Sequence, residues 1–256
     1  MKIEDLFSVR GKVALVTGGS RGIGEMIARG YVENGAKVYI TSRKGSDCAA
    51  LAEELSRFGE CIPIPADLSR MDEIDRLARE IEARESRLDI LVNNAGASWG
   101  ATFDEFPESG WDKVMDLNVK SVFFLTQRLV KLLEAAATPE DYSRVINIGS
   151  IDGIHVSGIE TYSYAASKAG VNHMTRMMAK FLAARHIAVN GIAPGWFPSR
   201  MNGPLPDEAR EAWRRNTPLK RLGTIEDMGG LAIFLCSRAG AFINGSTIVT
   251  DGGQTL

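Results

Sequence analysis

Tyr164 and Lys168 are the residues of this sequence whose types and spacing suggest chemistry most directly. They lie four residues apart in a segment predicted to be helical, so their side chains share one face. An ammonium beside a phenol favours the phenolate and lowers the tyrosine pKa from its ordinary value of about 10. Such a pair can act as general acid or base on an alcohol or ketone oxygen. Tyr162 has Ala166 four residues later, so Tyr164 is the predicted acid/base residue.

Two further polar residues could belong to the same site. Ser150 ends an apolar segment fourteen residues before Tyr164. Its hydroxyl could donate a hydrogen bond to a developing oxyanion. Asn118 interrupts an otherwise apolar helical stretch. It is either a packing residue with satisfied hydrogen bonds or a member of the site.

A glycine-rich turn follows the first apolar segment, with the sequence Thr17-Gly-Gly-Ser-Arg-Gly-Ile-Gly24. Gly18, Gly22 and Gly24 permit a tight turn, a close backbone approach and close helix packing. The free amides of the helix that follows favour a pyrophosphate. The spacing differs from the general dinucleotide fingerprint, but a strand before and a helix after it favour a cofactor site over a plain glycine turn.

The end of the second predicted strand indicates which dinucleotide binds. Enzymes that use NAD usually carry an acidic residue there, and this chain has Ser42 followed by Arg43 and Lys44. A guanidinium can pair with a 2′-phosphate, and Arg21 in the glycine turn can add a second positive charge. We therefore predict NADP(H), the alternative being that these cations are ordinary surface residues.

Other strand ends contribute further candidates. Asp67 follows the third strand and could reach the adenine edge or cap the next helix. Small residues at 93–96 would let a cofactor lie against the backbone. Trp99 and Trp196 follow central strands, and His155 lies close to Ser150, so these three are the predicted substrate-side residues, with lid packing as the alternative for the tryptophans.

The elements that must position these residues alternate regularly. Near-continuous apolar strands are predicted at about 12–17, 37–41, 61–65, 88–92, 144–148, 187–192 and 246–250, with helices at about 22–34, 46–58, 70–85, 111–136, 161–184 and 225–237. This pattern predicts an α/β Rossmann fold, a doubly wound parallel sheet of about seven strands with helices on both faces. We expect one domain over 1–256, with a proline-rich substrate lid at about 195–222.

Composition excludes several classes of protein. The net charge of -2 gives no basic surface for nucleic acid. The three cysteines are scattered and the three histidines isolated, so neither disulfides nor a metal site are expected. The N-terminus has an acidic pair where a signal peptide would be basic, and apolar runs are too short for a membrane span. We expect a cytoplasmic protein.

Over nearly its whole length the chain resembles the short-chain dehydrogenase/reductase family, through 17–24, 93–96, Asn118, Ser150, the Tyr164–Lys168 pair and 192–195. The resemblance implies that Tyr164 is the acid/base, Ser150 steadies the substrate oxygen, and Lys168 holds the nicotinamide ribose and lowers the Tyr164 pKa. Asn118 would hold a water of a proton relay. The predicted cofactor-binding residues are Gly18, Ser20, Arg21, Gly22, Ile23, Gly24, Ser42, Arg43, Asp67, Leu68, Asn94, Ala95, Gly96, Tyr164, Lys168, Pro194, Gly195 and Phe197.

Within that family, 93–100 and 194–201 look most like bacterial 3-oxoacyl reductases associated with rhamnolipid synthesis. This implies NADPH-dependent reduction of 3-oxoacyl thioesters to 3-hydroxyacyl thioesters. Arg185 matches a carrier-protein docking position, but 139–142 departs from the pattern, so a CoA thioester, a carrier-bound thioester or a free ketone all stay open.

Two other functions remain as alternatives: a polyol or sugar-acid dehydrogenase of the same family, and an NADP(H)-sensing regulator without turnover. The family also implies a homotetramer formed through the helices at about 111–136 and 161–184 and the C-terminal strand.

Overall fold

The computed structural model describes residues 2–198 and 206–256. Its strands coincide with the near-continuous apolar segments, and most of their residues are buried because helices cover both faces of the sheet. The strands are β1 (Val13–Thr17), β2 (Lys37–Thr41), β3 (Cys61–Pro63), β4 (Ile90–Asn93), β5 (Ser143–Ile148), β6 (Ile187–Pro194) and β7 (Thr247–Thr250).

These strands form one sheet in the order β3-β2-β1-β4-β5-β6-β7, and every neighbouring pair is parallel. In β1, for example, Val16 is in register with Ile40 on one side and Val92 on the other. The direction of winding reverses between β1 and β4, and ligands bind at such a switch point in open α/β sheets. The predicted fold class is confirmed.

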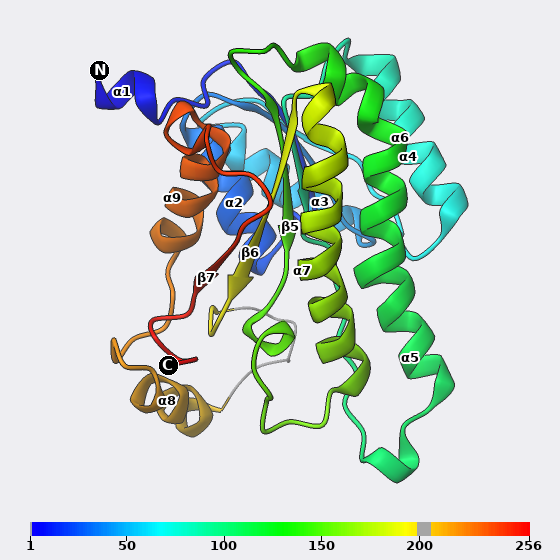
Figure 1. The fold of residues 1–256 in the computed structure, drawn as a ribbon, viewed down its shortest axis with the longest axis vertical. Coiled ribbons are helices and arrows are strands. Elements are labelled where there is room, and N and C mark those ends of the chain that lie inside the picture. The colour runs from blue at the N-terminus through cyan, green and yellow to red at the C-terminus, as the bar shows by residue number, and fades with distance from the viewer. Residues whose placement is uncertain (1, 199–205) are drawn as a thin grey trace.

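Helices cover both faces of the sheet (Figure 1). One apolar core lies under α2, α3 and α9, and the other lies under α4, α6 and α7. The helices are α1 (Ile3–Leu6), α2 (Gly22–Glu33), α3 (Gly45–Leu55), α4 (Met71–Arg84), α5 (Glu108–Met115), α6 (Ser121–Ala136), α7 (Tyr162–Leu182), α8 (Asp207–Asn216) and α9 (Ile225–Cys236).

Two features differ from the sequence-based expectation. The helix predicted over 111–136 is divided by a π-helical turn at Asp116–Lys120, which separates α5 from α6. The segment predicted as a lid contains a helix, α8, which lies below the sheet near the C-terminus (Figure 1). Residues 199–205 of that segment lie outside the described residues.

Within 2–198 and 206–256, no helix is both long and apolar enough to cross a membrane.

Candidate active site

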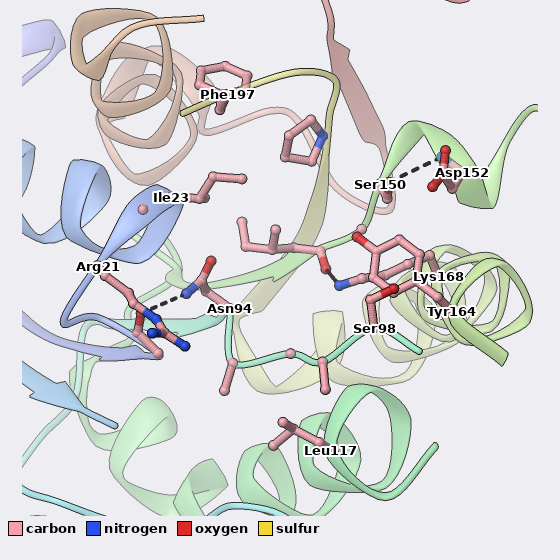
Figure 2. Close-up of a pocket in the computed structure, with 18 of the residues that line it drawn as sticks. Arg21, Ile23, Asn94, Ser98, Leu117, Ser150, Asp152, Tyr164, Lys168 and Phe197 are labelled. Atoms are coloured by element: carbon pink, nitrogen blue, oxygen red, sulfur yellow. Dashed lines mark hydrogen bonds between the residues drawn. The ribbon is translucent and has the colours of Figure 1, made fainter. Parts of the chain in front are cut away.

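A cavity of about 780 Å³ opens at the carboxyl ends of the strands. Figure 2 shows residues of the glycine turn at one end and Tyr164, Lys168 and Ser150 at the other. The predicted residues that line it are Gly18, Ser20, Arg21, Gly22, Ile23, Ser42, Arg43, Leu68, Asn94, Ala95, Gly96, Ser150, Tyr164, Lys168, Pro194, Gly195, Trp196 and Phe197.

The glycine turn joins β1 to α2 and requires glycine at defined positions. Gly18 and Gly22 have φ values of 61° and 58°, which side chains disfavour. Gly24 does not line the cavity. A Cβ at Gly24 would lie 2.3 Å from the carbonyl oxygen of Gly18, so its role in the structure is close packing of helix against turn.

Thr17, which the sequence reasoning did not single out as a site residue, connects this turn to the loop after β4. Its buried hydroxyl accepts hydrogen bonds from the backbone N–H groups of Asn94, at 2.8 Å, and Ala95, at 2.9 Å. The Asn94 side chain donates in turn to the carbonyl oxygens of Thr17 and Gly18. These bonds hold two strand ends together at the floor of the cavity.

Cationic side chains surround the far end of the cavity. Arg21 and Arg43 are exposed and line it, together with Lys44. Asp47 also lines this end, and one of its carboxylate oxygens lies 3.9 Å from the Lys44 ammonium. Ser42 stands at the end of β2, and its hydroxyl contacts the Lys44 carbonyl oxygen at 3.2 Å. The arrangement suits an anionic group such as a 2′-phosphate.

Asp67 is not among the residues that line the cavity. Its carboxylate accepts hydrogen bonds from the backbone N–H and the hydroxyl of Ser69, at 3.2 and 2.8 Å. This is the geometry of a side-chain-stabilised turn before α4, because aspartate readily bonds the backbone two residues on. The structure therefore does not support the predicted contact with the cofactor, and Leu68 lines the cavity there instead.

Lys168 lies one helical turn after Tyr164 on α7, as the spacing predicts. Its ammonium is 5.5 Å from the centre of the Tyr164 ring and donates to the Ile148 carbonyl oxygen at 2.7 Å. Only 4% of Lys168 is exposed. Burial disfavours the charged form and lowers the Lys168 pKa to about 8.

The pKa of Tyr164 moves in the direction opposite to the predicted one. Burial raises it to about 12, and the carboxylate of Asp152 adds to the rise, while hydrogen bonding with Ser150 opposes it. Loss of solvation is the larger effect here because the phenolate would be a buried anion. The predicted lowering by Lys168 is therefore wrong for this structure, and the phenol is protonated at neutral pH.

Ser150 and Asn118 occupy different positions relative to the cavity. Ser150 is buried at its wall, where its hydroxyl accepts a hydrogen bond from the Asp152 backbone N–H at 3.1 Å. Asn118 lies in the π-helical turn and is not among the lining residues. Its side chain bonds both backbone groups of Ala97, at 2.8 and 2.9 Å, and the Ser167 hydroxyl at 2.9 Å. Its side chain thus braces the loop after β4 against α7, the helix that carries Lys168.

The three predicted substrate-side residues lie in different places. Trp196 lines the main cavity and a neighbouring one of about 280 Å³, and His155 lines only the second. Trp99 lines neither of these. It packs on Gly110 of α5, whose Cβ would lie 2.8 Å from its ring, and the Lys113 ammonium lies 5.0 Å from the ring centre. Its ring fills the gap beside α5, so this geometry does not support the prediction that Trp99 faces the substrate.

Several lining residues escaped the sequence reasoning. Trp213 of α8 stacks on Trp196, with ring centres 3.5 Å apart and planes inclined by 22°. The proline-rich composition of the surrounding segment argued against a helix there. The charge pattern of α8, with acidic residues in the first turn and basic residues in the last, is typical of a helix and could have identified it. The other missed residues with polar or large side chains include Thr41, Lys44, Asp47, Ser98, Lys113, Leu117, Ile148, Ile151, Asp152, Ile159 and Thr161.

Comparisons with known proteins agree with this geometry. The model of a family described as enoyl-(acyl carrier protein) reductase matches residues 18–255. The rhamnolipids biosynthesis 3-oxoacyl-(acyl-carrier-protein) reductase of Pseudomonas aeruginosa is 51% identical over 252 residues, covering 98% of both chains. The 5-keto-D-gluconate 5-reductase of Escherichia coli is 38% identical over 259 residues, covering 99% of both.

A solved structure, the Pseudomonas aeruginosa RhlG/NADP active-site complex, superposes with a TM-score of 0.94 at 50% identity. The match covers 98% of this chain and 99% of that one. Family match, relatives and fold agree with the resemblance drawn from the sequence. The chain therefore belongs to the short-chain dehydrogenase/reductase family, a family of oxidoreductases.

Proposed function

We propose that this protein is an NADPH-dependent reductase that converts 3-oxoacyl thioesters to 3-hydroxyacyl thioesters. The observation that carries the proposal is a protonated phenol, Tyr164, at the inner end of a cavity whose outer end is cationic. The 51%-identical relative named for 3-oxoacyl reduction supports this substrate class.

The residues of the outer end fit NADP(H). The glycine turn leaves room for backbone to approach a pyrophosphate, and no acidic residue stands at Ser42 to repel a 2′-phosphate. Arg21 and Arg43 would hold that phosphate, and Asn94 to Gly96 would border the remainder of the cofactor. When bound, NADPH supplies the hydride to the carbonyl carbon.

The inner end supplies the proton and holds the substrate oxygen. Tyr164, with a pKa of about 12, stays protonated at neutral pH and can donate its proton to the ketone oxygen. The Ser150 hydroxyl would steady the same oxygen as negative charge develops. Lys168 would orient the nicotinamide ribose, and Asn118 would support the proton relay from behind the cavity wall, where its side chain already braces the loop after β4.

The apolar wall near the catalytic end suits an acyl chain. Ile159, Trp196 and Trp213 line both the main cavity and the second one. We propose that the segment 195–222, which includes α8, forms the lid over the acyl chain of the substrate. Arg185, the candidate for carrier-protein docking, forms an ion pair with Glu134, so a CoA thioester is the simpler substrate to expect.

The test is NADPH oxidation with acetoacetyl-CoA and longer 3-oxoacyl-CoA thioesters, compared with 5-keto-D-gluconate and other keto sugars. We expect turnover of the thioesters with kcat/KM that rises with chain length. Turnover of the sugars alone would overturn the proposal.

A second candidate, a sugar-acid dehydrogenase, is favoured by one observation. The second cavity has polar groups from Asp152, His155, Ser157, Asn216 and Gln254, which could bind hydroxyls. The 38%-identical relative named for 5-keto-D-gluconate reduction supports it. The same panel separates the two candidates, because only this one predicts that the keto sugar is the better substrate.

We also propose that the enzyme is a cytoplasmic homotetramer. Large apolar side chains are exposed on α6 and α7, with Phe123 42%, Met177 48% and Phe181 64% exposed. A second copy packing on them would bury this surface. The three cysteines are free and buried, which suits a reducing compartment. Light scattering should give four times the 27.8 kDa of one chain, and a monomer would contradict the assembly.

A further inference from the structure

Asp152 occupies a position that the proposed chemistry leaves unexplained. It follows Ser150 by two residues and lines both the main cavity and the second cavity. Figure 2 shows it beside Ser150, on the same side of the cavity as Tyr164. A carboxylate therefore stands where the catalytic end passes into the space beside it.

The carboxylate of Asp152 is only partly exposed. Within 2–198 and 206–256, no hydrogen bond or ion pair joins it to another side chain, so its charge is not neutralised by a fixed cation. The negative charge of Asp152 acts on the catalytic residue, because it raises the pKa of Tyr164. Its own pKa is raised by burial, and the nearby His155 opposes that rise.

The other charged groups at this end are placed differently. Lys168 donates to Ile148 and Lys113 lies over the Trp99 ring. In the second cavity, His155 is the other titratable residue among the described lining residues. Its Nδ1 is 2.9 Å from the Ile151 carbonyl oxygen, which can only accept. The Nδ1–H of His155 therefore donates to that carbonyl oxygen, and no Lys or Arg is among the described residues that line the second cavity.

We propose that Asp152 is a specificity-determining residue: its carboxylate, at the junction of the two cavities, excludes ketones that carry negative charge close to the reacting carbonyl. Neutral 3-oxo compounds, such as thioesters and esters, would enter, because their chain can lie along Ile159, Trp196 and Trp213. Keto acids would be repelled, because like charges in a partly desolvated site oppose each other strongly. The inference rests on the proposed function only in taking Tyr164 as the position of the reacting carbonyl.

The test compares two probes of one skeleton, acetoacetate and methyl acetoacetate, which differ in charge. Steady-state kcat/KM is measured with NADPH for the wild type and for Asp152→Asn. Asp112→Asn, which removes the same charge from the exposed face of α5, is the matched control. Dissociation constants of both probes with the enzyme and NADP⁺ are measured by calorimetry, so the comparison does not depend on turnover.

In the wild type we expect methyl acetoacetate to be preferred. Asp152→Asn should shift the preference toward acetoacetate by about tenfold, in binding and in kcat/KM, and Asp112→Asn should leave it unchanged. An unchanged preference in Asp152→Asn, or an equal shift in the control, would overturn the inference. Failure of the proposed function would give a different result. The enzyme would then not reduce 3-oxoacyl-CoA thioesters, but the preference for the neutral probe over the charged one would remain.

Discussion

Replacing Lys168 with methionine should abolish the proposed ribose contact and also change how stability depends on pH. The wild-type protein buries this ammonium, and burial lowers its pKa to about 8 from an ordinary value of 10.5. The folded protein therefore binds this proton less tightly than the unfolded chain. The resulting destabilisation is fully present below the folded pKa and is lost as the pH rises from there to the unfolded value.

The magnitude follows from the two pKa values. At 1.36 kcal/mol per pH unit, their difference corresponds to a cost of about 3 kcal/mol well below pH 8. Linkage then predicts that about 1 kcal/mol of this cost disappears between about pH 6 and about pH 9. Methionine also removes the bond to the Ile148 carbonyl oxygen, at a cost of ~1–3 kcal/mol that does not vary with pH.

The assay is urea unfolding of the wild type and Lys168→Met near pH 6 and near pH 9, at one protein concentration. The stability of the wild type relative to the variant should increase by about 1 kcal/mol between these two pH values. Lys180→Met, on the exposed face of the same helix, should show no such change. A stability difference that stays constant, or one that moves in the variant's favour as pH rises, would show that burial does not lower the Lys168 pKa.

Three further perturbations test separate parts of the site. Ser42→Asp should raise the KM for NADPH at least ~10-fold relative to NADH, because a carboxylate repels a 2′-phosphate; equal effects on the two cofactors in steady-state kinetics would contradict this. Trp213→Ala removes the stacking on Trp196 and should raise KM for long 3-oxoacyl thioesters more than for acetoacetyl-CoA; a chain-length profile that stays the same would remove α8 from the substrate wall. Asp152→Asn removes a charge that raises the Tyr164 pKa, so the alkaline limb of the kcat/KM profile for reduction should move to lower pH; a limb that stays or moves upward would disprove that influence.

Much of the fold follows from local patterns. The buried strands are nearly continuous apolar runs, and β2 (Lys37–Thr41) begins and ends at the predicted residues. The glycine turn at 17–24 was recognisable because backbone geometry demands glycine at Gly18 and Gly22. The Tyr164–Lys168 pair was predictable because helical spacing alone places both residues on one face.

The differences between the sequence-based predictions and the structure concern tertiary packing. The Trp99 ring packs against Gly110 because glycine has no side chain to occupy that space. Gly110 belongs to a different element, α5, so the sequence around Trp99 does not reveal this contact. The Asp67 carboxylate accepts hydrogen bonds from Ser69 and does not face the cavity. The sequence around Asp67 is compatible with either a cofactor contact or a local turn, so it does not show which of the two forms. The rise of the Tyr164 pKa reflects the depth of burial, which spacing along a helix does not reveal.

Tyr164 is the proposed proton donor in an NADPH-dependent carbonyl reduction. The most direct test is Tyr164→Phe, with NADPH affinity measured by fluorescence titration and acetoacetyl-CoA reduction followed by NADPH absorbance. We expect unchanged NADPH affinity and a loss of kcat of about 10²–10⁴-fold, because the variant lacks the general acid. A variant that reduces acetoacetyl-CoA as fast as the wild type would contradict it.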